Sequence, residues 1–133
     1  MQRVFLDANI LFSAAYREHA GLLRLWQLTG VQLVTSDYAA QEAASNLAES
    51  AQRDRLVGLI EGLVVLPHPQ TSIASPAGVS LPAKDAPILQ AAMNGHAAVL
   101  LTGDVAHFGR YFGKTVGGVR ILPPADFLHE FGS

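Results

Sequence analysis

The chain has 133 residues, of which 50% are hydrophobic and 15% charged, so it can bury a core and is not of the disordered class. It contains no cysteine, which excludes disulfides, zinc–thiolate sites and thiol chemistry, and fits a reducing cytoplasm. The formal net charge of −2 means that any nucleic-acid binding must come from a local site.

This length predicts a single domain over residues 1–133. We expect it to be cytoplasmic, because the first residues do not form a signal-peptide pattern and no apolar run approaches the ~20 residues that span a bilayer. In chain order, the first half predicts three strands, at residues 3–7, 31–35 and 64–66. Helices are expected at residues 9–16, 20–28, 36–47 and 52–62, with Gly30 ending the second and Ser36 capping the third.

Residues 67–82 are rich in proline, serine and glycine and predict a surface connection. After it we expect a helix at 84–94, a strongly apolar strand at 97–102 and an irregular glycine-rich stretch at 109–118. A last strand at 119–122 and a terminal helix at 123–131 complete the chain.

Strands that alternate with helices predict an α/β fold, a three-layer sandwich with a mostly parallel central sheet flanked by helices. In such sheets, ligands bind outside the carboxyl ends of the strands. Asp7 and Asp104 each follow an expected strand, in the segments VFLDANIL and VLLTGDVAHF. We therefore expect both carboxylates at one edge of the sheet.

Two further acids lie on expected helices: Glu42 in SDYAAQEAASNL and Asp85 in KDAPILQAA. Each of the four acids has an ordinary structural interpretation, as a helix cap, a turn residue or a solvated helix residue. Four clustered carboxylates would repel one another, however, unless a divalent cation lay between them. Mg²⁺ and Mn²⁺ prefer such oxygen ligands, and no cysteine or histidine cluster competes as a metal site.

These four segments resemble, in order and spacing, the acidic motifs of the PIN-domain family, small metal-dependent ribonucleases that include many VapC-like toxins of toxin–antitoxin pairs. The resemblance implies a PIN-like fold and RNA hydrolysis with Mg²⁺ or Mn²⁺, which activates water and leaves 5′-phosphate and 3′-hydroxyl ends. It implies RNA as the substrate and an antitoxin as a partner, and it leaves open a homodimer. The acids that it implies as catalytic and metal-binding are Asp7, Glu42, Asp85 and Asp104, supported by Asn9 and Thr102.

Many members of that family carry a further acid shortly after the last motif, where this chain has Val-Ala-His-Phe at residues 105–108. His107 could contact a phosphate, bind a metal or protonate a leaving group, but a lone histidine favours a surface turn residue. Three cations are candidates for RNA phosphate contacts, because one lies beside Asp85 and two are interleaved with aromatic residues: Lys84, Arg110 and Lys114.

Two other functions remain open from the sequence. An acid after the first strand is also the nucleophile position of haloacid-dehalogenase-type phosphatases, but their usual second acid is replaced here by Asn9. A non-catalytic module that binds RNA or protein is the other alternative, and the presence of all four acids counts against it.

Overall fold

A computed structural model describes residues 1–67 and 75–131. Its centre is a six-stranded sheet with the strand order β3-β2-β1-β4-β6-β5. The pairs β3–β2, β2–β1, β1–β4 and β4–β6 are parallel, and β5 alone pairs in the antiparallel sense. The strands are β1 (Gln2–Leu6), β2 (Val31–Ser36), β3 (Val64–Leu66), β4 (Val99–Leu101), β5 (Thr115–Val116) and β6 (Val119–Leu122).

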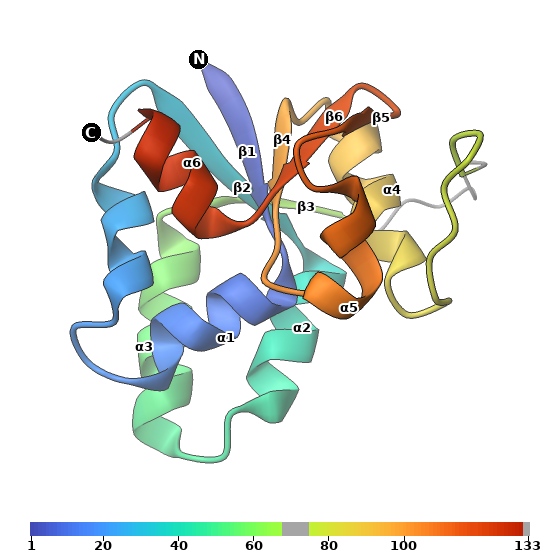
Figure 1. Cartoon of the computed structure of the whole chain (residues 1–133). Coiled ribbons are helices and arrows are strands. Elements are labelled where there is room, and N and C mark those ends of the chain that lie inside the picture. Colours follow the sequence, from blue (N-terminus) through green and yellow to red (C-terminus); the bar gives the residue numbers. More distant parts are fainter. Residues whose placement is uncertain (68–74, 132–133) are drawn as a thin grey trace.

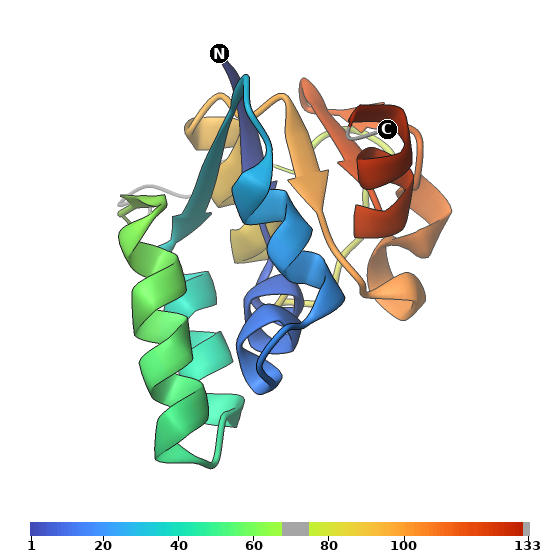
Figure 2. The ribbon, with the colours of Figure 1, turned by 90° about the vertical axis from the view of Figure 1, so that its left-hand side faces the viewer.

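Helices cover both faces of this sheet, which gives the three layers of an α/β sandwich (Figure 1). Turning the molecule shows α2 and α4 on one face, with η1 and α6 on the opposite face (Figure 2). The helix α1 lies beneath the carboxyl ends of the strands (Figure 1). The helices are α1 (Ala8–Tyr16), η1 (Gly21–Gln27), α2 (Asp37–Asn46), α3 (Ser50–Glu61), α4 (Ala86–Asn94), α5 (Val105–Phe108), η2 (Gly109–Tyr111) and α6 (Pro124–Phe131). No helix of the described residues is long and apolar enough to cross a membrane.

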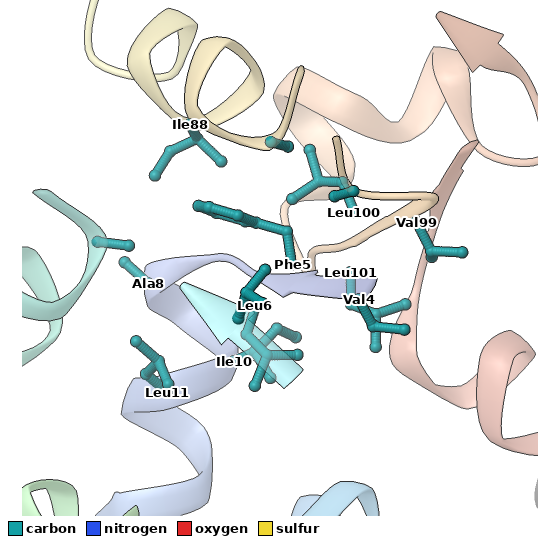
Figure 3. Packing of buried hydrophobic residues seen from close by; sticks show 14 of the residues in the cluster. Val4, Phe5, Leu6, Ala8, Ile10, Leu11, Ile88, Val99, Leu100 and Leu101 are labelled. Atoms are coloured by element: carbon teal, nitrogen blue, oxygen red, sulfur yellow. The ribbon is translucent and has the colours of Figure 1, made fainter. Parts of the chain in front are cut away.

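The central strand β1 is buried on both faces, as its unbroken apolar sequence requires. Val4, Phe5 and Leu6 are all 0% exposed. Phe5 points toward Ile88 of α4, whereas Leu6 lies on the side of Ile10 of α1 (Figure 3). The core therefore holds β1, α1 and α4 in fixed positions, and two of the four acids, Asp7 and Asp85, adjoin these elements.

The expected fold class is confirmed, and each expected strand is present within one or two residues of its predicted bounds. Residues 21–27, however, form a 3₁₀ helix rather than an α-helix. Ala20 at its start provides no side-chain acceptor for the first N–H groups, and the segment begins with a glycine, so an α-helical first turn is poorly stabilised. The helix expected from residue 84 begins at Ala86, with Asp85 as its cap.

The stretch 109–118 is not irregular, because it contains η2 and the short strand β5. Gly117 and Gly118 both have positive φ angles, 56° and 82°, between strands β5 and β6. Two consecutive residues with positive φ make the tight hairpin turn that matches the twist of the strands, and glycine adopts it without strain. The predicted surface connection at 67–82 falls partly on residues 68–74, which lie outside the described part of the chain.

Candidate metal centre

The strands β1 and β4 are neighbours, and both end at the same edge of the sheet. Leu6 pairs with Leu101, and the backbone N–H of Asp7 donates to the carbonyl of Leu101 at 3.1 Å. Asp104 follows three residues after Leu101. The parallel pairing therefore brings the first and last of the four acids together, as the sequence predicts.

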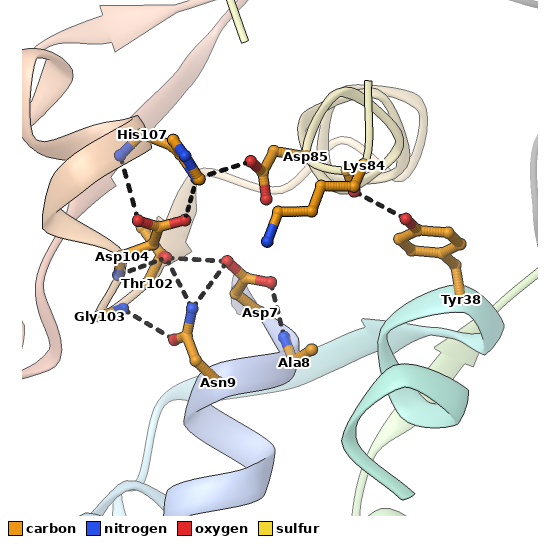
Figure 4. A network of polar contacts seen from close by, with 10 residues as sticks. All are labelled: Asp7, Ala8, Asn9, Tyr38, Lys84, Asp85, Thr102, Gly103, Asp104 and His107. Atoms are coloured by element: carbon orange, nitrogen blue, oxygen red, sulfur yellow. Dashed lines mark hydrogen bonds and ion pairs between the residues drawn. The ribbon is translucent and has the colours of Figure 1, made fainter. Parts of the chain in front are cut away.

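Asp7 caps α1 and is almost fully enclosed, with 4% of its surface exposed. Its Oδ1 accepts a hydrogen bond from the N–H of Ala8 at 2.6 Å. Its Oδ2 accepts one from the Thr102 hydroxyl at 2.8 Å and one from the Asn9 side chain at 3.2 Å (Figure 4). The carboxylate is thus held in a single orientation by donors from both sides of the sheet edge.

Burial raises the pKa of Asp7 from its ordinary value of 3.8 to about 6. Hydrogen bonds from Thr102 and Ala8 oppose the rise in pKa, while the negative charges of Glu42 and Asp85 add to it. An isolated buried carboxylate is costly, and a bound cation would offset that cost.

Asn9 and Thr102 tie the two strand ends to each other. The Asn9 amide donates to the Thr102 hydroxyl at 3.2 Å, and its Oδ1 accepts from the N–H of Gly103 at 2.8 Å. The Thr102 hydroxyl also accepts from the N–H of Asp104 at 3.1 Å. Asn9 and Thr102 therefore contact the acids directly and hold the ends of β1 and β4 together.

His107 lies between two of the acids. Its Nδ1 is 2.8 Å from Oδ2 of Asp104 and 2.9 Å from Oδ2 of Asp85 (Figure 4). Asp104 caps α5 by accepting from the N–H of His107 at 3.1 Å, and this one turn of helix returns the imidazole over the carboxylate. The interpretation of His107 as a surface turn residue is therefore wrong: it is a half-buried member of the cluster.

Asp85 caps α4 by position only, because its side chain accepts no capping hydrogen bond. The side chain turns instead toward His107, and the residue is 8% exposed. Among the described residues, its buried Oδ2 has no hydrogen-bond partner, since the Nδ1 contact satisfies the distance but not the direction of a hydrogen bond. Burial raises the pKa of Asp85, Asp104 raises it further, and the positive charges of His107 and Lys84 oppose the rise.

All four predicted acids line one cleft with a volume of about 560 Å³. Glu42 reaches it from α2, and Lys84 from the residue before Asp85. The other lining residues are Ala8, Asn9, Phe12, Asn46 and Gly103. Arg110 and Lys114, the remaining candidates for phosphate contacts, are exposed and do not line this cleft.

Tyr38 of α2 is a neighbour of the cleft that the sequence did not single out. Its hydroxyl donates to the backbone carbonyl of Lys84 at 2.7 Å, which joins α2 to the segment that carries Asp85. Partial burial raises the pKa of Tyr38, and the negative charges of Glu42, Asp85 and Asp7 raise it further. No local sequence signal could reveal this contact, because it joins residues 46 positions apart.

The donor groups fit a hard divalent cation. Acids from four separate chain segments line one cleft, and ligand atoms of Asp85, Asp104 and His107 lie within 4.8 Å of one another. Oδ2 of Asp85 is buried without a hydrogen bond from any described residue, which leaves its lone pairs available to a metal. The carboxylates suit Mg²⁺ or Mn²⁺, and a nitrogen donor suits the transition metal better.

Comparisons with known proteins show the fold and the family of this chain. The chain superposes on VapBC2 from Rickettsia felis, crystallised with a promoter DNA fragment, with a TM-score of 0.63, 14% identity and coverage of 92% of this chain and 98% of the other. It also superposes on FitAcB from Neisseria gonorrhoeae, with a TM-score of 0.56, 17% identity and the same coverages. A search of curated proteins finds no match. The sequence model of the PIN domain matches residues 3–106, most of the chain and all four acids, so the protein belongs to the PIN-domain family.

Proposed function

We propose that this protein is a divalent-metal-dependent endoribonuclease that hydrolyses RNA phosphodiester bonds, and that it is the toxin of a toxin–antitoxin pair. One observation carries the proposal: four acids, spread over 98 residues from Asp7 to Asp104, line one cleft, and one of their oxygens is buried without a hydrogen bond from any described residue. Membership of the PIN-domain family supports a nuclease. The similar VapBC2 assembly from Rickettsia felis supports the toxin–antitoxin assignment.

Asp7, Glu42, Asp85 and Asp104 are the residues that would hold Mg²⁺ or Mn²⁺ in this cleft. When bound, the metal supplies an acidic water and neutralises charge on the phosphoryl group. Thr102 and Asn9 keep the Asp7 carboxylate in one orientation through three hydrogen bonds that link the strand ends. His107 keeps Asp85 and Asp104 close in spite of their repulsion.

Lys84 places a cation at the edge of an otherwise acidic cleft. An unneutralised cluster of carboxylates repels a phosphate, and both a bound metal and the positive charge of Lys84 would weaken that repulsion. The cleft is only partly enclosed by its walls of α1, α2 and the start of α4, which suits a polymer rather than a small metabolite. A cytoplasmic location belongs to the same proposal, since that is where both RNA and an antitoxin are available.

Cleavage of a panel of defined RNAs tests the activity. Wild type should cut in Mg²⁺ or Mn²⁺ and not in EDTA, whereas Asp7→Asn and Asp104→Asn should lose at least a hundredfold in rate while remaining folded. Asp54→Asn, on the exposed part of α3, is the matched control and should cut as wild type does. A folded Asp104→Asn protein that cuts near the wild-type rate contradicts the proposal.

The partner is tested separately. Co-expression with the product of an adjacent gene should give a complex that survives purification and suppresses cleavage. Light scattering of the isolated chain decides whether it also forms a homodimer. Cleavage that no neighbouring gene product inhibits would leave a nuclease without the toxin role.

A further inference from the structure

A second and larger cavity, of about 770 Å³, lies beside the acidic cleft on the side of α1, η1 and α6. We call it the basic groove, because Arg17, Arg24 and His129 line it and no aspartate or glutamate does. Most of its remaining lining is apolar or small, and includes the rings of Phe12 and Tyr16. The acidic cleft has the opposite charge, with four carboxylates and one lysine.

The two arginines of this groove are not used to hold the fold together. Arg17 and Arg24 are exposed, and neither makes a hydrogen bond or an ion pair with a described residue. Other arginines of the chain are engaged: Arg53 and Arg55 donate to backbone carbonyls, and Arg120 pairs with Glu130 at 3.1 Å. In a protein with a net charge of −2, two unengaged guanidinium groups over one cavity are a local attraction for an anion.

Aromatic side chains line the groove together with these charges. Phe12 and Tyr16 are four residues apart on α1, so they share one face of the helix. Their ring centroids are 5.3 Å apart with an interplanar angle of 40°, and Tyr16 is 54% exposed. Exposed aromatic rings next to cations are the combination that binds single-stranded nucleic acid, by stacking bases and pairing phosphates.

The basic groove continues the acidic cleft rather than lying apart from it. Phe12 lines both cavities, and α1 begins directly after Asp7 and ends next to Arg17. At ~1.5 Å per residue the helix separates Asp7 from Arg17 by about 15 Å. A single-stranded RNA with one phosphate at the four acids can therefore pass over Phe12 and reach Arg17 and Arg24.

We propose that the basic groove binds the nucleotides of single-stranded RNA next to the phosphate that is cut, with Arg17 and Arg24 on phosphates and Tyr16 and Phe12 against bases. This inference rests on the proposed nuclease function, whose substrate path it extends. Charge favours RNA over a protein segment: no aspartate or glutamate lines the groove, and it adjoins a cleft whose proposed substrate is a polyanion. A second copy of this chain in the groove is the competing occupant.

Binding is measured without cleavage, by fluorescence anisotropy of a labelled single-stranded oligouridylate of about ten nucleotides in EDTA. The variants are Arg17→Gln/Arg24→Gln, Tyr16→Ala and a pair that removes equal charge elsewhere, Arg110→Gln/Lys114→Gln. All the substituted side chains are exposed, and the partly buried Phe12 is left intact. Melting curves check that each variant folds. Titrations are run from about 50 to 200 mM salt.

The groove pair should weaken binding at least tenfold and reduce the slope of log K against log salt by about 1.4, since each phosphate contact on a single strand contributes about 0.7. Tyr16→Ala should weaken binding about fivefold or more and leave the slope unchanged. An unchanged slope in the groove pair, or an equal loss in the pair Arg110→Gln/Lys114→Gln, overturns the inference. So does a groove pair that changes the oligomeric state in light scattering and binds RNA normally.

A cleavage assay with the same variants distinguishes a failure of this inference from a failure of the proposed nuclease function. If wild type does not cut RNA in Mn²⁺ but the groove pair alters binding as described, the nuclease proposal fails and the groove stands. If wild type cuts and the groove pair binds and cuts as wild type does, the groove fails and the nuclease stands.

Discussion

At the scale of single residues, the burial of the Asp7 carboxyl has a cost that the folded protein tolerates. Its buried carboxyl has a pKa of about 6 instead of 3.8, so the folded state keeps a proton that the unfolded chain releases. The free energy of unfolding therefore falls as pH rises from about 4 to above 6, and the full loss is about 3 kcal/mol at neutral pH.

Asp7→Asn removes this loss, although an amide nitrogen in place of Oδ2 cannot accept from Thr102 or Asn9 as Oδ2 does. We expect a net gain of about 1 to 2 kcal/mol, so that the variant melts several degrees above wild type in EDTA at pH 7.5. The two proteins should converge below about pH 3, where the carboxyl is largely protonated in both states. A variant that melts below wild type at both pH values would make Asp7 an ordinary helix cap.

The His107 side chain should stabilise the metal-free protein, because its imidazole contacts two carboxylates that would otherwise repel each other. His107→Ala leaves Asp85 and Asp104 facing each other, and we expect a lower melting temperature in EDTA. The imidazole is about one third exposed, so solvent limits the loss to about 1 kcal/mol. A double-mutant cycle with Asp104→Asn measures this coupling, and a coupling of zero would reduce His107 to a surface residue.

At the scale of elements, α4 is held in place by the packing of its last turn. A methyl group at Gly95, the residue that ends α4, would collide with the Leu66 side chain of β3 and lie 3.2 Å from the Ala91 carbonyl. Gly58, in the exposed middle of α3, has nothing within 4 Å of the same added atom.

The two glycines therefore form a matched pair. Gly95→Ala should destabilise the protein by about 1 kcal/mol, because the Leu66 side chain must leave its packed position. Gly58→Ala should stabilise it by about 0.5 to 1 kcal/mol through helix propensity. Chemical denaturation measures both, and equal signs for the two variants would contradict the packing described for α4.

At the scale of the whole molecule, the acids come from both ends of the chain. Asp7 and Glu42 lie in the first third, whereas Asp85 and Asp104 follow the connection between residues 67 and 82. A cation held by all four acids, as proposed, would join these two parts of the sheet edge. Its binding free energy is then added to the free energy of unfolding of the entire protein.

Mn²⁺ at about five times its dissociation constant should add about 1 kcal/mol, or a few degrees in melting temperature. Asp104→Asn should lose most of this rise, and the α3 control Asp54→Asn should keep it. Calorimetric scans with and without Mn²⁺ decide the matter. A full rise in the melting temperature of Asp104→Asn would place the metal away from the cleft. The single domain over all 133 residues stays a prediction.

Five of the six strands and most of the helices could be predicted from the sequence, because the central strands contain apolar runs and several helix caps are local signals, whereas β5 and η2 could not. Val4–Leu6 and Val99–Leu101 can only be core, and Ser36 caps α2 with its own side chain. The acids that follow these runs were predictable for the same reason: in a parallel sheet, the carboxyl ends of the strands share an edge.

Contacts across long sequence separations could not be predicted in this way. Only the tertiary structure places His107 against Asp85, aligns Tyr38 with the Lys84 carbonyl and joins α1 with η1 and α6 around Arg17. These contacts depend on side-chain direction and on how helices pack, which local propensity does not encode. The sequence by itself thus determined the fold class and the four acids, whereas the tertiary structure decided which side chains surround them, because only packing brings distant segments together.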